Sequence, residues 1–421
     1  MNQHEKLERV TKALDNFRIE IPSWGFANTG TRFGKFIQVA AATSIEEKFA
    51  DAAQINRLTG VTPTMALHVE WDLPQGVASV PAIRALEDKY EVRAGSINPN
   101  LFQPQEYKFG SICNPDPEVR QKALAHMLDC VEIARQLGSQ DISPWVSDGS
   151  NYPGTQNIRQ RIGWMEEIFS TVHRAMQPGQ RLLIEYKPFE PAFYHTDIAD
   201  WGMALELARL AGPQAKVLVD TGHHYQAQNI EQIVAWLLHL DMLGGFHLND
   251  RRYADDDLTL GSIDPYQVFR IFHEILSDAA MPNSNQIAVM VDQSHNLKGK
   301  VEAMVQTVAV AQEIYAKAAL IDLDRLATLQ SQCKLVEAEE LFRSAFWEDT
   351  RPMVRDWRHS HGLPEDPLLA LAESGYVEQI SRERAAKNAA VSTTYALSAV
   401  FVLIDLEDRN DNQCCERAAV S

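Results

Sequence analysis

The sequence alternates between short segments rich in aliphatic and β-branched residues and longer segments with a 3.6-residue apolar period. This alternation is typical of a parallel sheet whose strands are joined by crossover helices. We count eight such units, which favours closure into a (β/α)8 TIM barrel over an open sheet. The predicted strands are 18–24, 64–71, 92–97, 141–145, 181–187, 216–220, 244–250 and 287–293.

The apolar runs within these strands, such as LLIE, VLVD and IAVMVD, are nearly continuous, and each ends in a polar residue. Continuous runs are expected for strands that are covered on both faces. Helical periodicity fills the intervals, as in Pro117–Leu137 and 230–240. In a barrel the carboxyl ends of all strands face one mouth, so the polar strand ends are the candidate functional residues.

The organisation of the chain changes at both ends of this pattern. We predict a helical arm at residues 1–17, the catalytic barrel at 18–318 and a C-terminal helical extension at 319–387. Beyond residue 388 the pattern changes again, to an apolar run followed by an acidic polar stretch, and we expect a disordered tail at 388–421.

The charge balance limits the classes of partner. With 39 Lys and Arg against 57 Asp and Glu, the formal net charge is -18, so most of the surface repels nucleic acid and acidic membranes. Small neutral molecules and cations are the partners that this charge favours.

Composition also indicates the compartment. The number of cysteines, five, is odd and none forms a CxxC pair, which fits a reducing cytoplasm. The first sixteen residues lack the apolar core of a signal peptide. The longest apolar run, from Tyr395 to Ile404, is about half of the roughly 20 residues that a membrane-spanning helix needs. We therefore expect a cytoplasmic protein without a membrane span.

Acidic and imidazole side chains gather at the ends of four successive predicted strands. Carboxylates crowded at one mouth repel one another unless cations neutralise them. A first metal site is predicted from three carboxylates and one imidazole, which suit Mn²⁺, Mg²⁺ or Co²⁺ better than a thiolate-preferring ion: Glu185, Asp220, His247 and Asp292.

A second, more open metal site is predicted from His223 in DTGHH together with Asp255 and Asp257 in YADDDL. The i,i+2 spacing lets both aspartates of an extended loop face the same way. A single Asp at a strand end is more often a helix cap or a turn former, but seven candidate ligands gathered together favour metals. We assign structural roles to His224, Asp250 and Asp256.

The remaining strand ends offer the groups that a neutral polyol needs. Hydrogen-bonding candidates are His68, Lys187 and Ser294, and apolar faces are offered by Trp24, Trp145 and Phe102. A pocket that mixes donors, aromatic rings and metals suits the hydroxyl edge and the C–H face of a sugar. Neither a GxGxxG nor a GxxxxGK[ST] phosphate loop occurs, and no GxSxG elbow supports a serine nucleophile.

Over residues 18–386 the chain resembles the L-rhamnose isomerases, in particular the bacterial branch with broad aldose specificity. The matching segments begin at Ile21, Thr29, Leu67, Tyr107, Trp145, Glu185, Val219, Gly244 and Val291, and they read IPSWG, TGTRF, LHVEWD, YKFGS, WVSDGSNYPG, EYKPFEPAFY, VDTGHH, GGFHLNDRRYADDDL and VDQSHN.

This resemblance implies a homotetramer that binds two divalent metal ions, with Mn²⁺ expected and Co²⁺ or Mg²⁺ as alternatives. It implies isomerisation of L-rhamnose to L-rhamnulose with wider specificity, for example D-allose to D-psicose, by a metal-assisted hydride shift on the opened sugar. The metal at Glu185, Asp220, His247 and Asp292 would bind substrate, and the one at His223, Asp255 and Asp257 would be catalytic. It further implies catalytic roles for Asp292, Lys187 and His68, and substrate contacts for His68, Lys187, Trp24, Trp145, Phe102 and Ser294.

Three other functions remain open from the sequence. Another sugar isomerase or a ketose 3-epimerase on the same barrel would use a similar metal cluster. A metal-dependent endonuclease on a related barrel would need Lys- and Arg-rich loops, which the charge of -18 argues against. A non-catalytic sugar-binding protein would lack a ligand or an acid/base residue, and none is missing.

Overall fold

Eight parallel strands follow one another around a single sheet in the order β1-β2-β3-β4-β5-β8-β9-β10. The computed structural model describes residues 2–28, 36–190, 194–253, 257–277, 287–295 and 297–389. The strands are β1 (Ile21–Pro22), β2 (Thr64–His68), β3 (Arg93–Asn98), β4 (Asp141–Ile142), β5 (Arg181–Glu185), β8 (Ala215–Asp220), β9 (Leu243–Leu248) and β10 (Ala288–Val291).

The sheet closes between its first and last strands. The backbone N–H of Glu20 donates to the carbonyl of Val289 at 2.8 Å, and the N–H of Val291 donates to the carbonyl of Glu20 at 2.9 Å. Each of these eight strands lies within or overlaps one of the eight predicted segments. The predicted (β/α)8 barrel is therefore confirmed.

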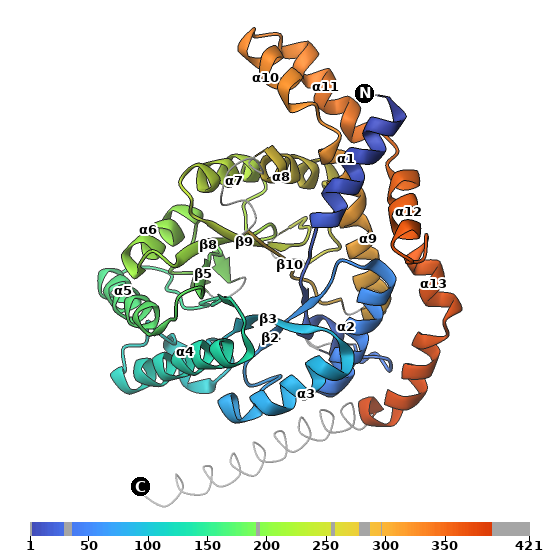
Figure 1. Cartoon of the computed structure of the whole chain (residues 1–421). Coiled ribbons are helices and arrows are strands. Elements are labelled where there is room, and N and C mark those ends of the chain that lie inside the picture. The colour runs from blue at the N-terminus through green and yellow to red at the C-terminus, as the bar shows by residue number, and fades with distance from the viewer. Residues whose placement is uncertain are drawn as a thin grey trace, which may run out of the picture.

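A ring of helices surrounds the strands (Figure 1). Its members are α2 (Ile45–Thr59), α3 (Val80–Tyr90), α4 (Pro117–Leu137), α5 (Ile158–Ala175), α6 (Trp201–Ala211), α7 (Ile230–His239), α8 (Pro265–Ser277) and α9 (Lys300–Ala319). Local sequence sets their ends: the Asp116 side chain accepts from the N–H of Glu118 at the start of α4, and Gly138 ends that helix with a φ of 75°. The predicted helix 117–137 matches α4.

Short 3-10 helices and one small strand pair lie in the loops between the barrel strands and helices. Three 3-10 helices are described, η1 (Ser23–Phe26), η2 (Gly76–Ser79) and η3 (Gln105–Phe109). After β5 the chain forms a small antiparallel pair, β6 (Phe189–Glu190) and β7 (Tyr194–His195). The sequence analysis did not predict this pair.

Helices also flank the barrel at both ends of the chain (Figure 1). They are α1 (Gln3–Asn16), α10 (Leu323–Ser331), α11 (Leu335–Trp347), α12 (Arg351–Ser360) and α13 (Pro367–Glu373). Polar contacts join the two groups: the Lys6 ammonium lies 2.7 Å from Glu348, and the Trp357 indole donates to Asp15 at 2.8 Å. The predicted C-terminal helices are present, whereas residues 390–421 of the predicted tail lie outside the described residues.

No helix within the described ranges is both long and apolar enough to cross a membrane.

Candidate metal centre and pocket

The alternation of side chains along each strand places the candidate ligands inside the barrel. Leu183, Leu218 and Met290 form a small apolar cluster separate from the main core. Because side chains two residues apart in a strand share a face, the residues two positions further on face the same interior at the strand ends. These residues are Glu185, Asp220 and Asp292.

The strand register brings the fourth candidate ligand alongside the other three. In the β8–β9 ladder Asp220 is the direct partner of His247, and in the β9–β10 ladder His247 pairs with Met290, two residues before Asp292. In the β5–β8 ladder Glu185 pairs with Leu218, two residues before Asp220. The parallel register therefore collects the four predicted ligands in one layer.

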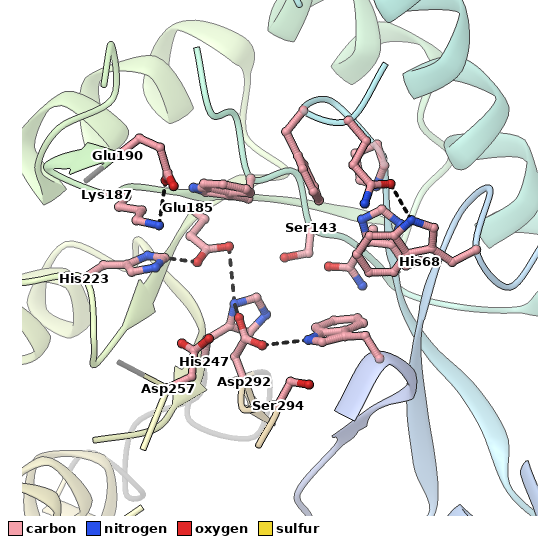
Figure 2. A pocket seen from close by; sticks show the side chains of 17 residues that line it. His68, Ser143, Glu185, Lys187, Glu190, His223, His247, Asp257, Asp292 and Ser294 are labelled. Atoms are coloured by element: carbon pink, nitrogen blue, oxygen red, sulfur yellow. Dashed lines mark hydrogen bonds and ion pairs between the residues drawn. The ribbon is translucent and has the colours of Figure 1, made fainter. Parts of the chain in front are cut away.

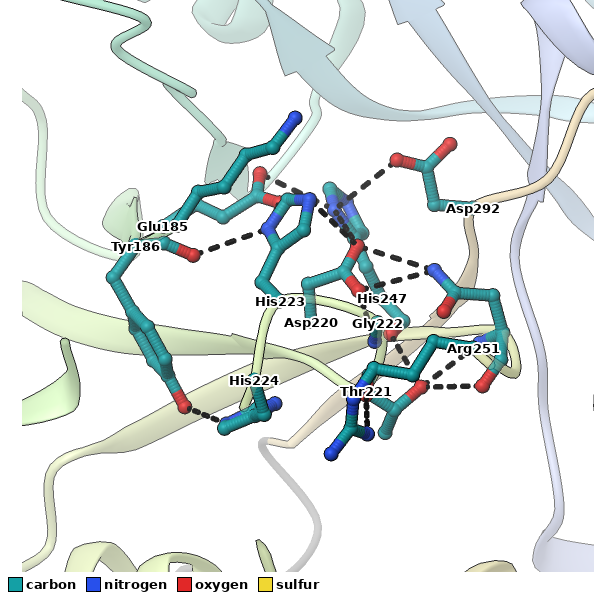
Figure 3. Close-up of polar contacts among 12 residues, drawn as sticks. Glu185, Tyr186, Asp220, Thr221, Gly222, His223, His224, His247, Arg251 and Asp292 are labelled. Atoms are coloured by element: carbon teal, nitrogen blue, oxygen red, sulfur yellow. Dashed lines mark hydrogen bonds and ion pairs between the residues drawn. The ribbon is translucent and has the colours of Figure 1, made fainter. Parts of the chain in front are cut away.

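The side chains converge as this layering requires (Figure 3). His247 Nδ1 lies 3.3 Å from Glu185 Oε2, and 3.9 Å from both Asp220 Oδ2 and Asp292 Oδ2. Ligand atoms of Asp220, His247 and Asp292 all lie within 4.8 Å of one another. Most of these side chains are buried, and Asp292 is the most open, with 24% of its side chain exposed.

His223, which the sequence assigned to a second metal, lies against the first cluster. Its Nδ1 is 3.1 Å from Glu185 Oε1, and its Nε2 is 3.9 Å from Asp220 Oδ2. Glu185, Asp220 and His223 also form a group that could hold an ion. Asp257 lines the same cavity, whereas Asp255 and Asp256 lie outside the described residues. The two described members of the second predicted set, His223 and Asp257, therefore line the same cavity as Glu185, His247 and Asp292.

The electrostatics of the cluster favour a bound positive charge. Burial alone would raise the pKa of Glu185, but the charge of His247 and the contact with His223 outweigh it and lower that pKa to about 2. Burial and the charges of Glu185 and Asp292 raise the pKa of Asp220 to about 7. Burial would lower the pKa of His247, but the surrounding carboxylates raise it to about 9. Positive charge among these three carboxylates is therefore favourable.

Buried polar atoms without a hydrogen-bond partner also favour a bound cation at this cluster. Both ring nitrogens of His247 are buried and make no hydrogen bond within the described part of the chain. Buried polar groups nearly always have a partner, so an orphaned imidazole beside three carboxylates fits a metal ligand. The oxygen-rich donor set suits a hard divalent cation.

Neighbouring groups hold these ligands in place. Asp220 accepts from the N–H of Gly222 at 2.6 Å and from Asn249 Nδ2 at 3.0 Å. A side chain at residue 222 would meet the Asn249 amide oxygen at 2.5 Å, which explains the glycine. His223 Nδ1 lies 3.1 Å from the carbonyl of Tyr186. Contacts of this kind orient metal ligands and select the imidazole tautomer.

The indole of Trp24 makes a further contact with a candidate ligand, across the point where β1 and β10 close the barrel. Trp24, in η1 directly after β1, donates from Nε1 to Asp292 Oδ1 at 2.8 Å. The sequence analysis assigned Trp24 only an apolar role in the pocket. Its hydrogen bond depends on β1 and β10 being neighbours, which only the closed barrel provides.

A cavity of about 340 Å³ opens beside the cluster (Figure 2). Its lining includes every described candidate ligand except Asp220, together with all six predicted substrate-binding residues, Trp24, His68, Phe102, Trp145, Lys187 and Ser294. The pocket therefore has a metal side and an aromatic side, as the sequence analysis expected for a polyol site.

The aromatic side of the cavity is built from stacked rings. The His68 ring stacks on Trp71 with centroids 3.7 Å apart, and Phe102 meets the rings of His68 and Trp145 at 5.6 and 5.0 Å. Burial lowers the pKa of His68 to about 3, so the imidazole is neutral at pH 7. His68 Nδ1 lies 3.0 Å from the carbonyl of Val69, and donation to that carbonyl leaves Nε2 as an acceptor.

Lys187 sits on the wall between the two sides. Its ammonium lies 2.9 Å from Glu190 and 4.8 Å from the centre of the Trp145 ring. The side chains of Lys187 and Glu190 are largely buried, at 4% and 12% exposure. This arrangement fixes a cation at the edge of the pocket.

Sequence reasoning missed six residues that line the cavity: Trp71, Asn98, Pro99, Gln103, Ser143 and Glu190. Asn98 and Ser143 lie at the ends of β3 and β4, so the strand-end criterion could have found them. Trp71 and Gln103 lie close in sequence to His68 and Phe102. Glu190 lies on β6, which no sequence signal indicated.

His224 and Asp250, to which the sequence analysis gave structural roles, make hydrogen-bond contacts outside the cluster of candidate ligands. His224 Nε2 is 2.6 Å from the Tyr186 hydroxyl (Figure 3). Asp250 Oδ2 accepts from the backbone N–H groups of Ile263 at 2.6 Å and Asp264 at 3.1 Å. Neither residue lines the cavity.

Comparisons with known proteins agree with this architecture. The family described as a xylose isomerase-like TIM barrel matches residues 49–279. A probable sugar isomerase of Rhizobium meliloti is 36% identical over 386 residues, covering 90% of this chain and 89% of that protein. A xylose isomerase of Thermus thermophilus is 26% identical over 212 residues, covering 47% of this chain and 54% of that protein.

Among solved structures, the 3-keto-D-glucoside 4-epimerase of E. coli aligns with a TM-score of 0.52 and 14% sequence identity. The alignment covers 70% of this chain and 99% of that one. At this identity the likeness shows the fold alone.

Proposed function

Because the chain belongs to the xylose isomerase-like TIM barrel family, we propose that it is a sugar isomerase that interconverts an aldose and its 2-ketose. L-rhamnose and L-rhamnulose are the proposed pair, with D-allose and D-psicose also accepted. The observation that carries the proposal is the gathering of Glu185, Asp220, His247 and Asp292 beside a cavity that is aromatic on its other side. The 36% identity to a probable sugar isomerase supports it.

Two divalent cations, Mn²⁺ in our proposal, would be held at the mouth. Glu185, Asp220, His247 and Asp292 would hold the first, and His223, Asp255 and Asp257 the second. When bound, such cations supply Lewis acidity that polarises the oxygens of the reacting sugar. The charge balance and the orphaned His247 ring fit this assignment.

The protein's own groups then bind the sugar and move its proton. In forming a ketose, hydrogen moves from C2 to C1 and a proton moves from O2 to O1. Lys187, anchored by Glu190, donates a hydrogen bond to the carbonyl oxygen, and Asp292 accepts the O2 proton and returns it at O1. Neutral His68 accepts a hydrogen bond from a sugar hydroxyl through Nε2. For a reaction run in deuterated water, a direct hydride shift leaves C1 of the ketose product without deuterium. An enediol route instead incorporates deuterium at C1.

The substrate assay tests the activity itself. Metal-loaded protein incubated with L-rhamnose, D-allose, L-mannose and D-xylose should form the corresponding 2-ketoses, with L-rhamnose converted most efficiently. Products are identified by chromatography against authentic ketoses. If ketoses were instead converted only to their 3-epimers, the protein would be an epimerase and the proposed isomerisation would be wrong.

The Trp24→Phe variant tests the outer contact to Asp292. Loss of the indole N–H should weaken Mn²⁺ binding about 10- to 100-fold, because outer partners of metal ligands typically contribute this much. Titration calorimetry of metal-free protein measures it. Trp71→Phe is the matched control, since the Trp71 indole lines the same cavity but donates to Gln103 at 2.7 Å. Equal Mn²⁺ affinities in the two variants would contradict the role of Trp24.

For the assembly we propose a homotetramer, as the resemblance implies, and for the location we propose the cytoplasm. Sedimentation of the purified protein measures the assembly directly.

A further inference from the structure

Unsatisfied polar atoms reveal a second feature of the same cavity. Within the described ranges, ten buried side-chain nitrogen and oxygen atoms have no hydrogen-bond partner. Four of them belong to residues that line this cavity: the two ring nitrogens of His247, Ser143 Oγ and Trp145 Nε1. The metal centre accounts for His247, but it does not account for the other two.

Ser143 and Trp145 follow the end of β4, with Pro144 between them. Extended backbone is favoured for the residue before a proline, and the N–H of Ser143 donates to the carbonyl of Ile97 at 3.0 Å, which holds the segment in place. Residues at i and i+2 of an extended segment share a face. Ser143 has only 1% exposure, and Figure 2 shows its hydroxyl pointing into the pocket between Glu185 and His68.

The neighbouring polar side chains are already occupied. Asn98, from the adjacent strand end, donates from Nδ2 to the carbonyl of Leu67 at 3.2 Å. Lys187 is held by Glu190. A buried hydroxyl or indole N–H left without a partner is costly, and a ligand in the cavity that both residues line can supply one.

The chemistry of the two groups selects that partner. An indole N–H only donates, whereas a serine hydroxyl both donates and accepts. A hydroxyl group, which both accepts and donates, can therefore pair with either of them.

We propose that Ser143 Oγ and Trp145 Nε1 form a hydroxyl-binding subsite of the substrate pocket. This inference rests on the proposed function, since it assigns these groups to hydroxyls of the bound sugar. Ser143 is then a specificity-determining residue that distinguishes a sugar bearing its partner hydroxyl from the corresponding deoxy sugar.

Binding of L-rhamnitol, which cannot be isomerised, tests the subsite without turnover. In metal-loaded protein, Ser143→Ala should weaken binding roughly 3- to 10-fold, the usual net contribution of one hydrogen bond. Trp145→Phe, which keeps an aromatic ring and removes the N–H, should have a similar effect. Ser147→Ala is the matched control, because Ser147 is buried in the same segment but is not among the residues that line the cavity. This variant should bind L-rhamnitol with the affinity of the wild type.

Deoxy analogues identify the hydroxyl. Affinities of the wild type and Ser143→Ala are compared for L-rhamnitol and for each of its monodeoxy forms. For one analogue the two proteins should bind equally, because the partner of Ser143 is then absent from the ligand. An unchanged affinity of Ser143→Ala for L-rhamnitol, or an equal loss for every ligand, would overturn the subsite. If the wild type neither bound L-rhamnitol nor converted any aldose, the proposed function would fail as well.

Discussion

Replacing Asp292 by asparagine is expected to lower kcat for aldose isomerisation at least about 100-fold, while the barrel remains folded. Even outer partners of metal ligands typically contribute 10- to 100-fold, and Asp292 would be both a ligand and the acid/base group. Its side chain is 24% exposed at the mouth, so the core does not depend on its packing. An amide also cannot carry the O2 proton.

Asp250→Asn is the matched control for this substitution. Asp250 follows β9 at the same end of the barrel, but its carboxylate accepts from the backbone of Ile263 and Asp264 instead of facing the cluster. The control should lose some thermal stability and retain Mn²⁺ affinity and kcat. Asp292→Asn with a kcat within a few fold of the wild type would show that this carboxylate is neither ligand nor proton carrier.

The arrangement of the ligands could be predicted because two simple periodicities determine it. Strand alternation puts Glu185 on the face of Leu183 and Asp220 on the face of Leu218, and parallel pairing then aligns Asp220 with His247. Apolar runs that end in a polar residue mark both the strand and its functional end. For this reason the barrel and its polar mouth could be inferred before any coordinates.

Contacts between distant segments could not be predicted in the same way. The hydrogen bond from Trp24 to Asp292 joins residues 268 positions apart, and it exists only because β1 closes onto β10. Glu190 enters the pocket from β6, which is too short to give a periodic signal. The end of β4 makes Ser143 a candidate in the sequence, but only the packing around it shows that its hydroxyl has no partner within the described residues.

The position of His223 illustrates the limit of reasoning from spacing. Its sequence neighbourhood suggested a site with the aspartates of the 255–257 loop, yet its ring lies 3.1 Å from Glu185. A histidine that touches the first ligand set and lines the same cavity as Asp257 would keep two bound cations close together. Charge at one site would then influence binding at the other.

Removal of the metals should abolish turnover and reduce the stability of the folded protein. A cation that binds only the native state stabilises it by about 2.7 kcal/mol when present at 100 times its Kd. Chelation should therefore lower the melting temperature of the wild type, and Mn²⁺ should restore both stability and isomerase activity. Differential scanning calorimetry and ketose formation measure the two effects. Turnover that survives complete chelation would exclude the proposed chemistry.

The Asp220→Asn variant tests this coupling between metal binding and stability. In the metal-free state, the substitution should raise the stability of the folded protein, whereas removal of the metals lowers it. Burial beside Glu185 and Asp292 raises the pKa of Asp220 to about 7, so its ionised form is unfavourable without a cation. An amide removes this charge, and its carbonyl oxygen can still accept from the N–H of Gly222. In the presence of chelator at pH 8, the metal-free variant should be about 0.5–2 kcal/mol more stable than the metal-free wild type. Such a gain is common when a functional residue is removed. Mn²⁺ should then fail to stabilise the variant, and a variant still stabilised by Mn²⁺ like the wild type would show that Asp220 is not a ligand.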